Sequence, residues 1–169
     1  WSYDTTGMAV PGAYDLMSIA LHEMGHGLGF VGLAKKDGTI GSFGTLEPSD
    51  FAPLFASFPW PELDTLPSIF DRYLSHALDG PLTMMDNPGT QLGAAFTSQQ
   101  IHFNGPLVMA GNGGVAPRIH ATTLFALGTS MVHLNESTYP PGNPHELMTP
   151  YAAPGHITHW PGTLCIDML

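Results

Sequence analysis

Apolar residues occur along this chain in short runs separated by turn residues, which favours several short elements over a few long ones. The clearest helix is expected over residues 16–28, because Asp15 is a suitable N-cap and the glycine-rich end (GHGLG, residues 25–29) supplies a stop. Each glycine there costs a helix about 1 kcal/mol relative to alanine. The glycines therefore predict a backbone that passes close to another segment, or turns sharply, after His26.

Two further helices and two strands are expected. One helix covers residues 68–77, and another runs from Pro161-Gly162 to the C-terminus. The helix over 68–77 would turn four side chains toward the core: Ile69, Tyr73, Leu74 and Ala77. Short strands are expected near residues 100–103 and 118–121. The pattern therefore predicts a loop-rich α+β fold.

Charge and composition restrict the class of protein. The 169 residues carry 14 acidic side chains against 4 lysines and arginines, a formal net charge of −10. Such a chain lacks the basic surface that nucleic acids and anionic membranes require, and no apolar run approaches the ~20 residues of a membrane span. Because 43% of the residues are apolar, the chain is expected to fold. No repeat or boundary is visible, so residues 1–169 are expected to form a single domain.

Few charges (11%) together with 20 glycines and 16 prolines are typical of a loop-rich secreted domain. The chain starts at Trp1 and shows no signal peptide, which we interpret as a mature or trimmed extracellular chain. The lone Cys165 excludes an internal disulfide framework. It lies in an apolar terminal run, where a small core residue is expected rather than a nucleophile.

The run His22-Glu23-Met24-Gly25-His26 predicts a catalytic zinc site. At positions i and i+4, two imidazoles share one helix face, roughly 5–6 Å apart at Cβ, which suits binding of one metal ion. Glu23 lies about 100° further round the helix, beside the metal, where a general base for the metal-bound water is needed. His22 and His26 are therefore expected as metal ligands and Glu23 as the catalytic residue.

A catalytic zinc site usually has three protein ligands, so a third must come from elsewhere in the chain. The position six residues after His26 is Gly32, which has no side chain and excludes the contiguous H-E-x-x-H-x-x-G-x-x-H arrangement. Glu47, followed by Asp50, has the spacing of the thermolysin-type glutamate. However, Glu47 precedes Pro48 in a glycine-rich segment, which disfavours the helix that such a ligand needs.

The segment HEMGHGLGF, residues 22–30, resembles the active-site helix of the leishmanolysin-like metzincins and is similar to that of a broader group of secreted bacterial proteins. In that family the third histidine lies far downstream, before a Met-turn of the form E-L-M-x-P. Here His133 precedes Glu146-Leu147-Met148-Thr149-Pro150 in the same order. The resemblance implies His133 as third zinc ligand, Met148 beneath the metal, and residues 31–132 as an inserted subdomain.

The resemblance also implies a metzincin-like active-site helix and Met-turn, but only residues 1–21 precede His22, so the N-terminal sheet is expected to be reduced or missing. His145 is a rival third ligand, although it lies only three residues from Met148 and beside a proline. Three further residues are candidates for the cleft: Tyr151, His156 and His159. The turns Asp37-Gly38 and Asp86-Asn87 are candidates for calcium, although such turns usually serve only as turns.

These residues together predict a secreted zinc metalloendopeptidase that hydrolyses a protein or peptide substrate through a metal-bound water, with Glu23 as general base. The alternative is a non-catalytic structural or adhesive extracellular module derived from a metallopeptidase, in which zinc only stabilises the fold. Glu23 favours the enzyme, because a purely structural zinc site has no use for a general base.

Overall fold

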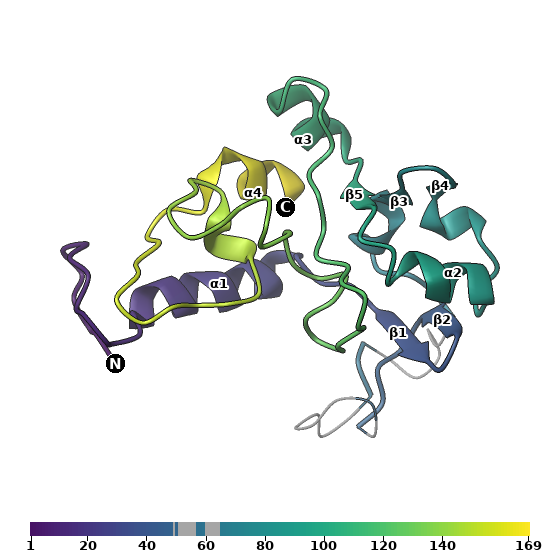
Figure 1. Ribbon diagram of the computed structural model, residues 1–169, viewed down its shortest axis with the longest axis horizontal. Helices are drawn as coiled ribbons and strands as arrows, with labels where there is room; N and C mark the ends of the chain where they lie inside the picture. The colour runs from purple at the N-terminus through teal and green to yellow at the C-terminus, as the bar shows by residue number, and fades with distance from the viewer. Residues whose placement is uncertain (49, 51–56, 60–64) are drawn as a thin grey trace.

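Long loops connect four α-helices and two small antiparallel sheets in the computed structural model, which describes residues 1–48, 50, 57–59 and 65–169 (Figure 1). The helices are α1 (Leu16–Leu28), α2 (Thr90–Ala95), α3 (Pro106–Gly111) and α4 (Gly162–Met168). The strands are β1 (Ala34–Asp37), β2 (Ile40–Phe43), β3 (Leu74–His76), β4 (Gly80–Pro81) and β5 (Ile101–Phe103). Short 3₁₀ turns are η2 (Asp71–Tyr73), η3 (Leu82–Met84) and η4 (Glu146–Met148). The predicted α+β class is confirmed.

Helix α1 has the bounds that the sequence predicts. The carboxylate of Asp15 accepts hydrogen bonds from the backbone N–H and the hydroxyl of Ser18, at 2.8 and 2.7 Å, and so satisfies a free amide of the first turn. At the other end, the N–H of Gly29 donates to the carbonyl of His26 at 3.2 Å, and Gly29 has a φ of 138°. A side chain would strain this backbone, so glycine is needed where the chain leaves the helix and buries Phe30.

The two sheets are short and antiparallel. Strands β1 and β2 form a hairpin, in which Ala34 is paired with Phe43. Strand β3 lies between β4 and β5, and Leu74 is paired with Phe103. Helix α2 lies directly against β2, where a Cβ on Gly41 would come within 2.5 Å of a backbone nitrogen in the helix. The hairpin and helix α2 therefore pack backbone to backbone.

The helix predicted over residues 68–77 is wrong. This segment forms the single 3₁₀ turn η2 and then strand β3. The carboxylate of Asp71 accepts the N–H groups of Ser68 and Leu33, both at 2.8 Å, and this side-chain bonding competes with a helix. Of the four side chains expected in the core, Leu74 is buried, whereas the others are exposed: Ile69, Tyr73 and Ala77.

Two of the other three predicted elements are confirmed. Strand β5 confirms the strand near residues 100–103, and α4 confirms the C-terminal helix. Residues 118–121 form two isolated bridges rather than a strand, from Arg118 to His102 and from Ile119 to Leu134. Cys165 is buried in α4, and burial raises the pKa of its thiol to about 12, as expected for a core residue.

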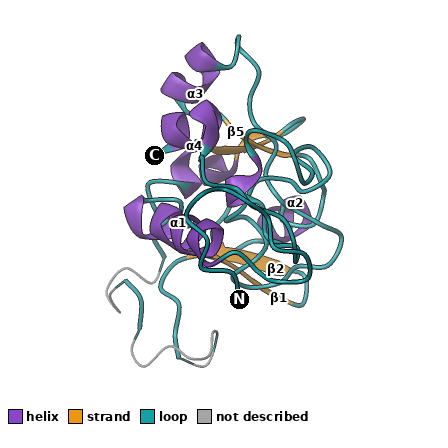
Figure 2. Cartoon of the chain, turned by 90° about the vertical axis from the view of Figure 1, so that its left-hand side faces the viewer, coloured by secondary structure: helices purple, strands orange, loops and turns teal. Residues whose placement is uncertain are grey.

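One hydrophobic core joins the end of α1 to the sheet around β3. The ring of Phe30 lies 4.8 Å from that of Phe70, and Phe70 lies 4.9 Å from Phe103, measured between ring centroids. All three side chains are at most 2% exposed. The same core includes Met148 and Leu164. Residues between His26 and His133 therefore share one core with the C-terminal part of the chain. Figure 2 shows α1, α3 and α4 among the loops that make up much of the molecule.

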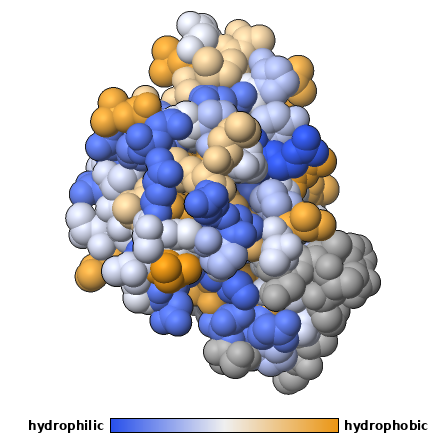
Figure 3. Space-filling model, turned by 90° about the vertical axis from the view of Figure 1, so that its right-hand side faces the viewer, coloured by the Kyte–Doolittle hydropathy of each residue, from blue (hydrophilic) through white to orange (hydrophobic). Residues whose placement is uncertain are grey.

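Residues 1–15 contain no strand, only an isolated bridge from Ser2 to Asp15. Among the described residues, no helix has the length and apolar character needed to cross a membrane. On the face shown in Figure 3, hydrophobic residues are interspersed with hydrophilic ones.

Candidate metal centre

Three histidine side chains from two distant parts of the chain converge on one point. His22 and His26 lie one turn apart on α1, and His133 comes from the loop before η4. The Nε2 atom of His22 lies 3.0 Å from that of His26 and 3.2 Å from that of His133, and the remaining pair is 3.2 Å apart. The structure thus brings together the three ligands predicted from sequence.

Each of these imidazoles has its other ring nitrogen bound to a backbone carbonyl. Nδ1 of His22 lies 2.7 Å from the carbonyl of Leu147, and Nδ1 of His26 lies 2.7 Å from that of Phe30. Nδ1 of His133 lies 2.9 Å from the carbonyl of Thr129. A carbonyl only accepts, so each Nδ1 carries the proton and each Nε2 presents a lone pair. Three lone pairs then face one another with no hydrogen between them.

This arrangement fits a cation. Ligand atoms of a tetrahedral zinc site with Zn–N distances of about 2.0–2.1 Å lie about 3.3 Å apart, close to the observed spacing. Burial lowers the pKa of His133 to about 3 and also lowers that of His22, so both rings are neutral, the form that binds metal. The three histidines can therefore hold a metal ion, and no fourth His, Cys, Asp or Glu from the described part of the chain joins their cluster.

Backbone pairing on both sides holds His133 in place. The N–H of His120 donates to the carbonyl of His133 at 2.8 Å, and the N–H of Leu134 donates to the carbonyl of Met148 at 2.8 Å. Just before His133, the buried Met131 has a φ of 71°, in the left-handed region that few side chains adopt. The chain therefore reverses at Met131 and presents the third histidine toward α1.

Met148 packs against helix α1 at Gly25, one residue before the ligand candidate His26. A Cβ added to Gly25 would lie 2.5 Å from Sδ of Met148, closer than any ordinary contact. Gly25 is also the buried residue of α1. The close approach that the glycines of this helix predict is therefore found at Gly25, and its partner is Met148 of η4.

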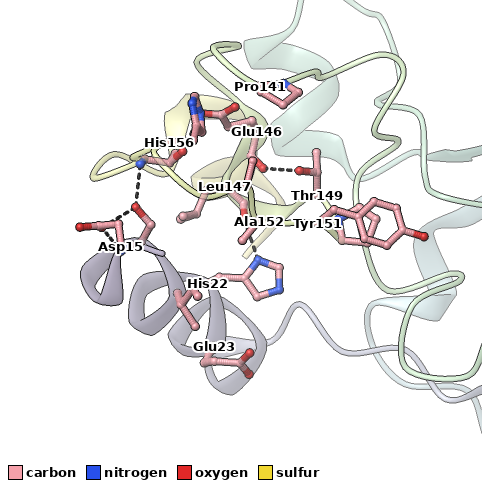
Figure 4. A pocket seen from close by; sticks show the side chains of 15 residues that line it. Asp15, His22, Glu23, Pro141, Glu146, Leu147, Thr149, Tyr151, Ala152 and His156 are labelled. Atoms are coloured by element: carbon pink, nitrogen blue, oxygen red, sulfur yellow. Dashed lines mark hydrogen bonds and ion pairs between the residues drawn. The ribbon is translucent and has the colours of Figure 1, made fainter. Parts of the chain in front are cut away.

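A pocket of about 230 Å³ opens beside the histidines and is lined by both His22 and Glu23 (Figure 4). Its walls come from the first turns of α1, from η4 and from the segment that follows η4. Glu23 is exposed to solvent there and lies next to a ligand without being one. A carboxylate so placed can act as a proton acceptor for a water molecule in the pocket.

The remaining predicted residues divide into those that reach the pocket and those that do not. Tyr151 lines it, is 61% exposed, and lies edge-on to His120 with ring centroids 5.9 Å apart. His156 also lines it and donates from Nε2 to Glu146 at 2.6 Å. His159 lies outside the lining and pairs with the carboxylate of Asp15 at 2.8 Å.

The rival ligands lie elsewhere. Glu47 accepts a hydrogen bond from the hydroxyl of Ser57 at 2.5 Å and is not part of the histidine cluster. His145 packs against Gly162 at the start of α4, where a Cβ would lie 2.5 Å from its Nδ1. Neither residue contributes a ligand atom to the three-histidine group.

The calcium candidates also form no such group. Within the described ranges, the three histidines are the one cluster of three or more His, Cys, Asp or Glu side chains close enough to share an ion, and Asp37 and Asp86 lie outside it. The side-chain oxygen of Asn87 accepts the N–H of Phe43 at 2.8 Å, so this amide ties the hairpin to the following loop.

At the polar end of the pocket five side chains meet: Asp15, Ser18, Glu146, His156 and Thr158. Of these, sequence reasoning named only His156 as a residue of the cleft. Asp15 was expected only as an N-cap and Glu146 only as part of the Met-turn. Since Asp15 lies seven residues, or about two helical turns, before His22, helical spacing alone places it on the same face as the ligand.

No protein-family model matches the chain, and neither a curated protein nor a solved structure matches it.

Proposed function

We propose that this protein is a zinc-dependent endopeptidase of the metzincin class, with His22, His26 and His133 as metal ligands. The observation that carries the proposal is the set of three Nε2 lone pairs 3.0–3.2 Å apart, each oriented by a backbone carbonyl. Two histidines on a helix and a third from a loop match the three-ligand set of a catalytic zinc site. The sequence resemblance to leishmanolysin-like metzincins supports the same class and an extracellular location.

When bound, the zinc ion would supply Lewis-acid polarisation of the scissile carbonyl and acidify a water molecule. The residues of this chain do the rest. Glu23 takes a proton from the attacking water and passes it to the leaving amine, so the carboxylate is unchanged after each cycle. The carbonyls of Leu147, Phe30 and Thr129 keep the three rings in the tautomer that leaves Nε2 free. Met148 would make no bond to the metal, and its side chain packs against Gly25 of the same helix.

The position of Glu23 supports an enzyme rather than a structural zinc module. A structural site usually has a fourth protein ligand and no open side. Here the described cluster consists of three histidines, and an ionisable carboxylate faces the pocket next to them. The arrangement therefore favours hydrolysis over a role of zinc in stability alone.

A chelation and reconstitution assay tests the proposal. Purified protein is stripped with a chelator, reloaded with one equivalent of zinc, and assayed on casein and on a mixture of unstructured peptides. We expect cleavage by the zinc-loaded protein and none by the stripped protein. Glu23→Gln should keep one zinc per chain and lose at least about 10²–10⁴ in kcat, the typical contribution of a general base.

One outcome would contradict the enzyme, and another would contradict only the role of Glu23. Zinc binding without cleavage of any substrate would favour the non-catalytic structural or adhesive module. Full activity of Glu23→Gln would remove this residue from the mechanism, even if the protein is a hydrolase.

A further inference from the structure

The pocket beside Glu23 has an apolar wall and a polar end. The apolar wall is formed by Ile19, Leu147, Pro150, Ala152 and Ala153. The polar end is formed by Asp15, Ser18, Glu146, His156 and Thr158. Figure 4 shows Asp15 and Tyr151 on opposite sides of the pocket, with the Tyr151 hydroxyl directed away from Asp15. At about 230 Å³ the pocket is smaller than the ~300–1,000 Å³ of typical ligand sites, which suits a single side chain.

Hydrogen atoms at the polar end are already donated within the protein. The hydroxyl of Ser18 donates to Asp15 at 2.7 Å, and the hydroxyl of Thr158 donates to Glu146 at 2.6 Å. Nε2 of His156 donates to the same carboxylate at 2.6 Å. These hydrogens are therefore used within the protein, and the carboxylates of Asp15 and Glu146 are the acidic groups at this end of the pocket.

The charge of the pocket has the same sign as that of the chain. Asp15 is 3% exposed, and its Oδ1 is buried with no hydrogen-bond partner. Although burial opposes ionisation, the hydrogen bonds from Ser18 and His159 hold the pKa of Asp15 below its usual value, so it is a carboxylate. Glu146 and Glu23 add two more acidic groups to the lining, and none of the four lysines and arginines of the chain lines it.

We infer that this pocket receives a lysine or arginine side chain of the peptide substrate, so that cleavage occurs beside basic residues. The aliphatic stem of such a side chain packs along Ile19 and Leu147, and its cationic head faces the carboxylates of Asp15 and Glu146 at the polar end. A leucine brings no charge to these carboxylates, and a glutamate would add a like charge. This inference rests on the proposed function and adds the substrate class to it.

Three quenched fluorescent peptides test this specificity. They share one uncharged sequence and differ at a single central position, which is lysine, leucine or glutamate. Assays of the zinc-loaded protein at pH 8 keep histidines above their usual pKa of about 6.5. We expect kcat/KM for the lysine peptide to exceed that of the leucine peptide at least about tenfold, because a site built for hydrogen bonds rejects analogues that lack them. Mass spectrometry should place the cut at the lysine.

Variants that remove the charge but keep the shape identify the responsible residues. In Asp15→Asn the helix keeps an N-cap acceptor, and the ratio of kcat/KM between the lysine and leucine peptides should fall several-fold. Glu146→Gln should reduce the same ratio. Asp86→Asn removes an exposed carboxylate that does not line the pocket, and should leave the ratio unchanged.

A binding measurement separates this inference from the proposed function. Titration of the zinc-loaded Glu23→Gln protein with the same peptides should show tighter binding of the lysine peptide, and addition of Asp15→Asn should abolish the difference. Cleavage without preference for lysine overturns the inference and keeps the hydrolase. If nothing is cleaved, the hydrolase fails; lysine-selective binding then still supports the cationic pocket, whereas equal binding of lysine and leucine peptides overturns it.

Discussion

The imidazole of His133 is the proposed ligand that comes from the loop before η4 and meets the two histidines of helix α1. Replacing it with alanine leaves two ligands on one helix, and two imidazoles alone do not complete a zinc site. We expect His133→Ala to weaken zinc binding by more than the 10–100-fold typical of losing an outer hydrogen-bond partner. Metal content after gel filtration, measured by plasma mass spectrometry, checks this.

His145→Ala provides the matched control, because this ring lies near α4 and outside the histidine cluster. It should retain one zinc per chain. If His133→Ala keeps its zinc and His145→Ala loses it, the third ligand has been assigned to the wrong residue.

The motif on α1 was sufficient to predict His22, Glu23 and His26 as site residues, because neighbours on one helix turn keep their relative positions in any fold. The third ligand came only from resemblance, since nothing local connects residue 133 to residue 26. Asp15 illustrates what local reasoning overlooks. Its hydrogen bonds to Ser18 are those of an N-cap, whereas its contact with His159 joins residues 144 positions apart.

Helix α1 contains two glycines that differ only in what lies opposite them. In an open helix, glycine to alanine stabilises by about 1 kcal/mol. Nothing lies within 4 Å of a Cβ at Gly27, so Gly27→Ala should raise the free energy of unfolding by up to that amount. Gly25→Ala drives a methyl group into Met148 and should lower it by about 1–3 kcal/mol.

Urea denaturation of the zinc-free protein measures both changes. Met148→Ala in the Gly25→Ala background should recover part of the loss, because the side chain that clashes is gone. An equal increase in stability for the two glycine variants would contradict packing of the Met-turn against this face of α1.

The segment over residues 68–77 shows why element prediction failed where it did. Its residues suit a helix, but Asp71 bonds to Leu33, 38 positions away, and Leu74 pairs with Phe103. These partners lie far along the chain and leave no local signal. Helices α1 and α4 were predictable because caps and turn residues in the adjacent sequence determine where they begin.

Buried Asp71 couples the stability of the entire chain to pH. Burial raises its pKa to about 6 from an ordinary value of 3.8. Between about pH 4 and 6 the folded chain therefore holds a proton that the unfolded chain has released, and stability falls as pH rises through this window. The contribution reaches at most about 3 kcal/mol.

Buried neutral histidines such as His133 give the opposite slope, so the quantity to measure is the difference between wild type and Asp71→Asn. Denaturation of the zinc-free proteins at several pH values provides it. The wild type should lose stability relative to Asp71→Asn between pH 4 and 7. A difference that stays constant over this range would show that Asp71 has the same pKa in both states.

The separation of the ligands along the chain has a consequence for how the protein unfolds. His22 and His133 are 111 positions apart, so a metal held by both would close a loop that contains most of the chain. By the loop-entropy relation for cross-links, closing a loop of about 100 residues disfavours the unfolded state by about 4.7 kcal/mol. Zinc would then act as a removable cross-link, and a chelator would lower the melting temperature as well as abolish activity.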